Sequence, residues 1–324
     1  MGGGMQREVL EWLGRSGVGV FAVHYVRHRH VITEEGAEGR SKRIRRIAHL
    51  AFVLGPTPFR HAETSPATVT AMSDVISIET LGAIATITID RAPVNALTAE
   101  HWTELRDVIA MTADNHELRA VVVAGENQSF CAGADIRTLT EPHADMDEAE
   151  MLLVVADAAN AIRQHRAPVI AAIDGPAHGG GLELALACDI RIASPRATFA
   201  AAGINMGLIA SVSSLIDAIG DTRARRMLLT GYRITAADAS LWGLVTDVDD
   251  APLDAAMAVA SAIATKPPLA VEATKYAVAQ RPRLSPAEHS DLMGELFRFL
   301  ATSDDHAEAI RAFLEKRRGN YGRR

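Results

Sequence analysis

The sequence has little cysteine, no paired cysteine motif and no long apolar run. Only two cysteines occur in 324 residues, Cys131 and Cys188, and they lie in separate apolar surroundings without a CxxC pair. This spacing argues against a zinc site and a disulfide framework, so we predict no bound metal and a reducing, cytoplasmic location. Because no uninterrupted run reaches about 18 apolar residues, we also predict no membrane span.

Negative charge dominates the chain, but not its first part. The net charge is −7, while residues 1–71 hold 10 Lys and Arg against 6 Asp and Glu, which gives +4 and leaves −11 for the rest. The 48% hydrophobic content is sufficient for a sizeable core. An acidic main body argues against a nucleic-acid partner.

Residues 1–71 differ from the rest in pattern as well as charge. They contain the basic run Ser41–Arg46 and show neither helical nor strand periodicity. Such a run could bind nucleic acid or act as a targeting signal, but it is more often simply solvated. We therefore predict a poorly structured basic leader over residues 1–71. An alternative is that the natural chain begins at Met72, just before the first clear strand pattern.

Strand and helix patterns alternate from residue 72 onward. A hairpin opens the segment, and helices then alternate with continuous apolar strands, which is typical of βαβ units around a parallel sheet. The predicted strands are residues 75–78, 84–89, 119–124, 168–173 and 190–193, and the predicted helices between them are residues 98–112, 151–164 and 182–188. The pattern is helical from residue 251 to the end. We predict an α/β core over residues 72–265 and a helical region over residues 266–324.

Two turns rich in small residues follow predicted parallel strands. The first covers residues 131–134, with Asp135 as a cap for the segment after it. The second covers residues 179–181, three consecutive glycines, and leads into a helix with Glu183 in its first turn. Glycine permits close backbone approach, and the first N–H groups of a helix lack internal partners. Because turns after parallel strands share one edge of the sheet, these N–H groups could form an oxyanion hole.

Each turn also has a purely structural explanation. Glu183 could merely cap the start of its helix. The small residues at 131–134 could serve tight packing of a strand against a helix. The local patterns leave both explanations open.

Several motifs taken together resemble a known family. They are Arg91 with Asn95-Ala96-Leu97, Phe130-Cys131-Ala132-Gly133-Ala134-Asp135-Ile136, residues 168–177 (PVIAAIDGPA), Gly179-Gly180-Gly181-Leu182-Glu183-Leu184-Ala185, Cys188-Asp189-Ile190 and Phe313-Leu314-Glu315-Lys316-Arg317. In order and spacing over residues 74–324, the set resembles the enoyl-CoA hydratase/isomerase, or crotonase, superfamily. The resemblance does not cover residues 1–71.

The resemblance implies a fold, a ligand and an assembly. The implied fold class is α/β, a crotonase-like spiral of repeated ββα units with a C-terminal helical trimerisation region. The implied ligand is an acyl-CoA thioester, and the implied assembly is a homotrimer or a dimer of trimers. Because coenzyme A is then part of the substrate, no separate cofactor is expected.

The resemblance also implies site residues. The thioester carbonyl would accept hydrogen bonds from the backbone N–H groups of Ala134 and Gly180, and Glu183 would act as acid or base. The further substrate-binding residues are Ala132, Asp135, Ile136, Arg137, Gly179, Gly203, Ser211, Phe313 and Lys316. Among these, Arg137, Phe313 and Lys316 match family positions that contact the phosphates or adenine of coenzyme A.

One position departs from the hydratase pattern. Four residues after Phe199, where hydratases carry a second acid, this chain has Gly203. The hydroxyls of Ser211 and Ser213 or the amide of Asn205 could hold a water, but none of these groups can replace an acid. Three functions therefore remain open: an enoyl-CoA hydratase-type lyase, a double-bond isomerase that shuttles one proton on Glu183, and a non-catalytic acyl-CoA-binding protein.

Overall fold

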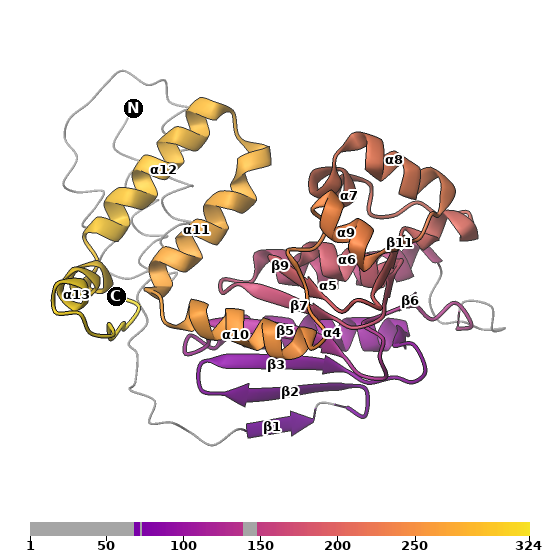
Figure 1. Cartoon of the computed structure of the whole chain (residues 1–324), viewed down its shortest axis with the longest axis horizontal. Helices are drawn as coiled ribbons and strands as arrows, with labels where there is room; N and C mark the ends of the chain where they lie inside the picture. Colours follow the sequence, from indigo (N-terminus) through magenta and orange to yellow (C-terminus); the bar gives the residue numbers. More distant parts are fainter. Residues whose placement is uncertain (1–67, 72, 139–147) are drawn as a thin grey trace, which may run out of the picture. The chain divides into compact units, whose positions relative to one another are not determined.

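The computed structural model describes residues 68–71, 73–138 and 148–324 (Figure 1). The contacts within the chain separate two compact units. The described residues up to Ser285 belong to the first, which we call the core unit. Pro286–Arg324 belong to the second, which we call the C-terminal unit.

Within the described residues, a seven-stranded sheet organises the core unit (Figure 1). Its order is β1-β2-β3-β5-β7-β9-β12. Its strands are Thr68–Ala71 (β1), Ile76–Leu81 (β2), Ile84–Ile89 (β3), Ala120–Gly125 (β5), Val169–Ile173 (β7), Ile190–Ala193 (β9) and Asp247–Val248 (β12). Neighbours among β1, β2 and β3 are antiparallel, and all later neighbours are parallel. The predicted hairpin followed by parallel strands is confirmed.

Helices and short second-layer strands follow the main strands in a repeating order. The helices of the core unit are α4 (Ala99–Asp114), α5 (Glu148–Gln164), α6 (Gly180–Ala187), α7 (Val212–Ile219), α8 (Asp221–Thr230), α9 (Ala236–Trp242), α10 (Pro252–Ala264) and α11 (Pro268–Gln280), with the 3-10 helices η1 (Ala202–Met206) and η2 (Arg281–Arg283). The short strands are β4 (Ala96–Leu97), β6 (Gly133–Ala134), β8 (Pro176–His178), β10 (Thr198–Ala200) and β11 (Ile234–Thr235). The chain therefore repeats a ββα unit as β3-β4-α4, β5-β6-α5 and β7-β8-α6, as the predicted spiral requires.

Side chains of the central strands alternate between two apolar clusters. Along β5, Val121 and Val123 enter a cluster shared with buried residues of α4, α5 and α6. Val122 and Ala124 point to the opposite face and meet buried alanines of α10. Helices thus cover both faces of the parallel strands, which explains why β5 and β7 consist of continuous apolar residues. Within the described ranges, no helix is long and apolar enough to cross a membrane.

The sheet begins earlier than the sequence predicted. Residues 68–71 fall within the leader that we expected to be poorly structured, yet they form β1 and pair antiparallel with β2, from Thr68 opposite Thr80 to Ala71 opposite Ser77. The exposed edge of the hairpin accepts this additional strand, although the segment has no apolar alternation strong enough to predict it. The expectation for residues 1–67 lies outside the described residues.

The core unit also ends later than expected, at Ser285 rather than at residue 265. Helix α11 belongs to the core unit, and a buried ion pair joins it to Arg166, which follows α5. A guanidinium nitrogen of Arg166 lies 2.8 Å from a carboxylate oxygen of Glu272 on α11, and both side chains are buried. Arg166 and Glu272 are 106 residues apart in the sequence, so the local helical pattern does not indicate that they pair.

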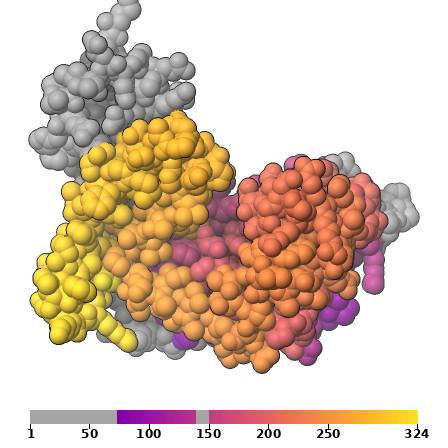
Figure 2. Space-filling model, turned by 45° about the horizontal axis from the view of Figure 1, so that its top comes forward, coloured from indigo at the N-terminus to yellow at the C-terminus, as the bar shows by residue number. Residues whose placement is uncertain are grey.

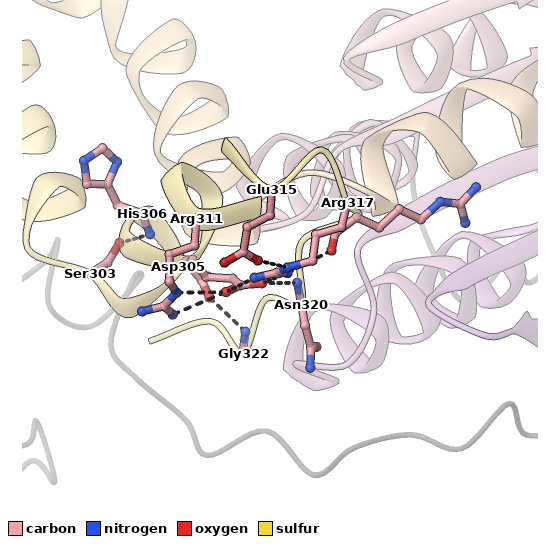
Figure 3. Close-up of polar contacts among 10 residues, drawn as sticks. Ser303, Asp305, His306, Arg311, Glu315, Arg317, Asn320 and Gly322 are labelled. Atoms are coloured by element: carbon pink, nitrogen blue, oxygen red, sulfur yellow. Dashed lines mark hydrogen bonds and ion pairs between the residues drawn. The ribbon is translucent and has the colours of Figure 1, made fainter. Parts of the chain in front are cut away.

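The described part of the C-terminal unit contains two helices, α12 (Pro286–Ala301) and α13 (Asp304–Leu314). The tail after α13 folds back on that helix (Figure 3). The carboxylate of Asp305 accepts a hydrogen bond from the backbone N–H of Gly322 at 2.8 Å. Glu308 pairs with the guanidinium of Arg317 and accepts from the backbone N–H of Asn320 at 3.0 Å. Two acidic side chains of one helix therefore hold the tail.

Candidate active site

The two small-residue turns touch each other. The backbone N–H of Cys131 donates to the carbonyl of Pro176 at 2.9 Å, and that of His178 donates to the carbonyl of Cys131 at 3.0 Å. Gly133 has a left-handed φ of 101°, and a Cβ added there would lie 2.9 Å from the backbone nitrogen of Gly180. Only glycine fits so close to the other turn. The two turns, which the sequence predicted to lie at the same edge of the sheet, are therefore in direct contact.

The backbone N–H groups of Ala134 and Gly180 lie at this junction. Asp135, the residue after Ala134, donates its N–H to the carbonyl of Leu97 at 2.8 Å. Because successive N–H groups of a strand point in opposite directions, that of Ala134 points away from β4. Gly180 is the first residue of α6, where N–H groups have no partner within the helix. Both predicted donors are thus oriented away from regular backbone pairing.

Neighbouring elements fix the position of the glycine turn. A Cβ added at Gly181 would lie 1.9 Å from the carbonyl oxygen of Cys131, so the backbone there requires glycine. A Cβ at Gly180 would lie 3.0 Å from the ring of Trp102 on α4 and 3.2 Å from Val155 on α5. The start of α6 is therefore enclosed by the preceding two helices.

Glu183 lies in the first turn of α6, as predicted, and has charged and polar neighbours there. Its Oε1 atom accepts hydrogen bonds from the guanidinium of Arg163 and from the hydroxyl of Ser214 at 3.1 Å. The Glu183 side chain is 16% exposed. Among the described residues, Oε2 is buried and meets no hydrogen-bond donor. The carboxylate is thus held at one oxygen and left available at the other.

Arg163 and Ser214 were not predicted from the sequence. The polar groups expected near the missing acid were Ser211, Ser213 and Asn205. Ser211 instead forms the left-handed N-cap of α7, with φ of 58°. Ser214, one helical turn further on, provides the hydroxyl at Glu183, and the helical spacing of the serine run could have suggested it. No local pattern marks Arg163, because its partner lies 20 residues away along the chain.

Gly203 lies in η1 beside an apolar cavity of about 330 Å³. Side chains of the loop after η1, of α7 and of α8 line this cavity, among them Leu208, Val212 and Leu228. Glu183 does not line it. A Cβ added at Gly203 would lie 3.4 Å from the carbonyl oxygen of Leu208, which is an ordinary contact. Steric exclusion therefore does not explain the absence of an acid at this position.

The remaining predicted residues near the first turn have structural contacts. The Ala132 N–H donates to the carbonyl of Val94 at 3.0 Å. Asp135 accepts from the Arg137 N–H at 3.2 Å, which confirms its capping role, and it also pairs with Arg91 at 2.8 Å. The side chain of Ile136 is exposed. Contact of these residues with a ligand stays a prediction, as it does for Gly179, whose N–H donates to the Ala200 carbonyl at 3.0 Å.

Phe313 and Lys316 belong to the C-terminal unit. Phe313, near the end of α13, is 83% exposed. Lys316 follows the helix with a left-handed φ of 52° and donates its N–H to the Phe313 carbonyl at 3.2 Å. An exposed aromatic ring beside a lysine is compatible with the predicted contact to coenzyme A, which stays a prediction.

Burial shifts the titration of three groups near the turns. It raises the pKa of the Cys131 and Cys188 thiols to about 12, so neither cysteine provides a thiolate near neutral pH. Burial, together with the charge of Arg233, lowers the pKa of His178 to about 4 and keeps its ring neutral. The described residues contain no group of three His, Cys, Asp or Glu that could hold a metal ion. Glu183 thus stands out as the acid/base candidate.

A spiral of ββα units with two small-residue turns meeting above the parallel strands defines the crotonase-like class of α/β fold. The chain belongs to the enoyl-CoA hydratase/isomerase family, because residues 79–324 match the family model of that description. The fold and family predicted from the motifs are therefore confirmed.

Individual relatives support the same assignment. The chain is 37% identical over 253 residues to the probable enoyl-CoA hydratase echA12 of Mycobacterium leprae, covering 72% of this chain and 85% of the relative. It is 34% identical over 252 residues to (E)-benzylidenesuccinyl-CoA hydratase of Thauera aromatica, covering 75% and 96%. The structure of DspI from Pseudomonas aeruginosa aligns with a TM-score of 0.73 at 32% identity, covering 78% of this chain and 98% of DspI. Relatives named as hydratases support an enzyme of this class.

Proposed function

We propose that this protein is an enoyl-CoA hydratase-type lyase acting on an acyl-CoA thioester, in fatty-acid or related acyl-CoA metabolism. The observation that carries the proposal is the junction of the two turns. It brings together the segments that hold the backbone N–H groups of Ala134 and Gly180, and Glu183 follows within one turn of α6. Family membership and relatives named as hydratases support the reaction class.

The junction supplies an oxyanion hole in this proposal. The thioester oxygen accepts hydrogen bonds from Ala134 and Gly180, and these bonds strengthen as the carbonyl becomes an enolate. The N-terminus of α6 adds its positive end to the same place. Losing one such donor typically costs about 10²–10³ in kcat.

Glu183 supplies the proton transfer. Its carboxylate takes a proton from a water as the water oxygen bonds to Cβ of the enoyl group, and the electron pair of the double bond moves onto the thioester oxygen. The proton then passes from Glu183 to Cα, and the carbonyl re-forms. One carboxylate and one water are enough to balance this reaction. In the proposal, Oε2, which has no hydrogen-bond partner among the described residues, takes up the proton and delivers it.

Gly203 supports a second candidate, a double-bond isomerase. Moving a double bond from the 3 to the 2 position needs one base that takes a proton from Cα and returns it to Cγ. A site with one carboxylate can do this without a water. The absence of an acid at Gly203 is the observation that favours this alternative.

We also propose that the chain assembles as a trimer or a dimer of trimers. Large apolar side chains are exposed over residues 202–230, which form η1, α7, α8 and the loop after η1 and are salmon in Figure 2. They are Ile204, Met206, Leu208, Ile209, Val212 and Leu229. Apolar surface of this kind is typical of protein interfaces. Sedimentation equilibrium measures the assembly, and a monomer at micromolar concentration would contradict this part of the proposal.

The proposed reaction is tested by incubating the full chain with short and long 2-enoyl- and 3-enoyl-CoA and identifying the products by mass and retention. Hydration adds the mass of water, whereas isomerisation changes retention at constant mass. We expect hydration by the wild type, loss of turnover in Glu183→Gln, and a fall of about 10²–10³-fold in Ala134→Pro, which lacks one N–H donor. Ala134→Gly keeps the donor and is the matched control.

The outcomes separate the three functions. A wild type that binds the thioesters and converts none of them is a non-catalytic binding protein. Conversion of 3-enoyl-CoA alone identifies the isomerase. Equal turnover by the wild type and Glu183→Gln would show that another group transfers the proton.

A further inference from the structure

The carboxylate of Glu183 is held by two side chains from other parts of the core unit. Arg163 lies in the last turn of α5, and Ser214 lies in α7. The guanidinium of Arg163 and the hydroxyl of Ser214 both donate to Oε1, and the guanidinium also donates to the Ser214 hydroxyl oxygen at 3.1 Å. Three helices thus converge on one carboxylate oxygen.

The second oxygen of the same carboxylate has a different environment. Within the described part of the chain, Oε2 is buried and has no hydrogen-bond partner. A buried carboxylate oxygen without a donor is costly unless a ligand or water uses it. Oε1 of Glu183 is therefore fixed by its two donors, whereas Oε2 can accept and release a proton.

We infer that Arg163 and Ser214 are positioning residues that hold Glu183 for catalysis by a single acid. The inference rests on the proposed function. With Gly203 in place of a second acid, one oxygen must accept the proton of the attacking water and later deliver it to Cα. Rotation of the carboxylate between these two steps would carry the proton away from the substrate. Two donors fixed on Oε1 prevent that rotation and leave Oε2 facing the reacting atoms.

The charge of Arg163 contributes to the same arrangement. The Glu183 side chain is 16% exposed, and the Arg163 side chain is 33% exposed, so the pair lies at the border of the interior. A partly buried carboxylate without a cation loses hydration that nothing replaces, which favours turning toward solvent. Pairing with Arg163 therefore keeps the Glu183 carboxylate inside the site.

The inference is tested by kinetics of Arg163→Gln, Arg163→Lys and Ser214→Ala with the 2-enoyl-CoA that the wild type hydrates. We expect Arg163→Gln to lower kcat by about 10–100-fold, because misplacement of a reacting group by about 1 Å can cost about 10²-fold. KM should stay within about twofold, since neither residue binds the thioester. Arg163→Lys should recover part of the loss, and Ser214→Ala should lose less than Arg163→Gln.

Arg106→Gln is the matched control, because Arg106 lies on the surface of α4 and pairs with its neighbour Asp107. It should leave kcat and KM unchanged. A kcat of Arg163→Gln equal to the wild-type value, or a rise in KM that accounts for the whole loss, would overturn the inference while leaving the proposed function intact. A wild type that converts no enoyl thioester would overturn both.

A thermal double-mutant cycle adds a readout that does not depend on turnover. If Arg163 and Glu183 pair in solution, the midpoint of thermal unfolding should fall less in the double variant, Arg163→Gln with Glu183→Gln, than the sum of the two single changes. Additive changes would show that the pair does not form and would overturn the inference.

Discussion

Gly203 occupies a backbone position that can carry a side chain. It is not among the glycines with left-handed φ, and an added Cβ would meet the Leu208 carbonyl oxygen at an ordinary 3.4 Å. The neighbouring cavity of about 330 Å³ offers room for a longer side chain. An acid can therefore be introduced where the hydratase pattern expects one.

We predict that Gly203→Glu raises the rate of 2-enoyl-CoA hydration by about tenfold. Correctly placed acid/base catalysis is worth roughly 10²–10⁴-fold, and a new side chain reaches only part of it. Gly203→Gln has the same size without the acid and should show no gain. The rate of product formation at saturating substrate measures the effect. An equal gain in both variants, or a thioester-bound Gly203→Glu protein with no gain, would contradict the prediction.

At the scale of residues, the sequence predicts positions where the backbone requires glycine. It does not predict contacts between side chains that are far apart along the chain. The two small-residue turns were predictable because Gly133 in the first and Gly181 in the second have no room for a Cβ, and this requirement appears in the sequence as glycine. The neighbours of Glu183 were not predictable. Arg163 reaches Glu183 only because α5 packs beside α6, and nothing near Arg163 in the sequence indicates that approach.

At the scale of elements, long periodic segments were predicted well and very short strands were not. The helix predicted over residues 98–112 is α4, and the strands predicted over residues 84–89 and 190–193 are β3 and β9 with the expected bounds. The two-residue strands β4 and β6 exist because Ala96 pairs with Gly133 and Leu97 with Ala134. Such strands are defined by their partners rather than by their own pattern, so no local signal marks them.

The tail that follows α13 should respond to acid. The hydrogen bond from Arg317, followed by that from the backbone of Asn320, lowers the pKa of Glu308 from 4.5 to about 2 (Figure 3 shows Arg317 and Asn320). A lowered pKa in the folded state means that the contact stabilises the folded tail above pH 4.5. That contribution is lost as the pH falls from 4.5 to about 2.

We predict that the amide resonance of Asn320 titrates with a midpoint near pH 2. Its N–H donates to Glu308 at 3.0 Å, so the shift reports protonation of that carboxylate. Glu308→Gln removes the charge and should abolish the titration. Nuclear magnetic resonance from neutral pH to well below the expected midpoint follows the titration. A midpoint near the ordinary glutamate value of 4.5 would show that the tail does not pair with Glu308 in solution.

At the scale of the whole molecule, the fold class was predictable from the order of the motifs, and the limits of the compact units were not. The ββα repeats leave a regular alternation of strands and helices in the sequence. Residues 251–324 read as one helical region, yet α10 and α11 belong to the core unit and α12 and α13 to the C-terminal unit. The division depends on side-chain pairing across the core, which helical periodicity does not encode.

The ion pair between Arg166 and Glu272 should be the contact that keeps α11 in the core unit. The Glu272 side chain is 2% exposed and that of Arg166 is 7% exposed. Arg166 also donates to the carbonyls of Ala113 at 3.0 Å and Leu118 at 2.9 Å. One guanidinium thus joins the end of α4, the start of β5 and α11, so removing the carboxylate of Glu272 leaves a buried cation without the negative charge that neutralises it.

We predict that Glu272→Ala lowers the free energy of unfolding by about 3–5 kcal/mol, the usual result of removing one partner from a buried pair. The midpoint of thermal unfolding should fall by roughly 10 °C for a unit of this size. Asp157→Ala, an exposed acid on α5, is the control and should stay within about 0.5 kcal/mol. Replacing both partners, Arg166→Met with Glu272→Leu, should recover part of the loss because no uncompensated charge remains. A Glu272→Ala protein as stable as the control would mean that other contacts of α11 hold it on the core, and that the ion pair follows from that packing rather than causing it.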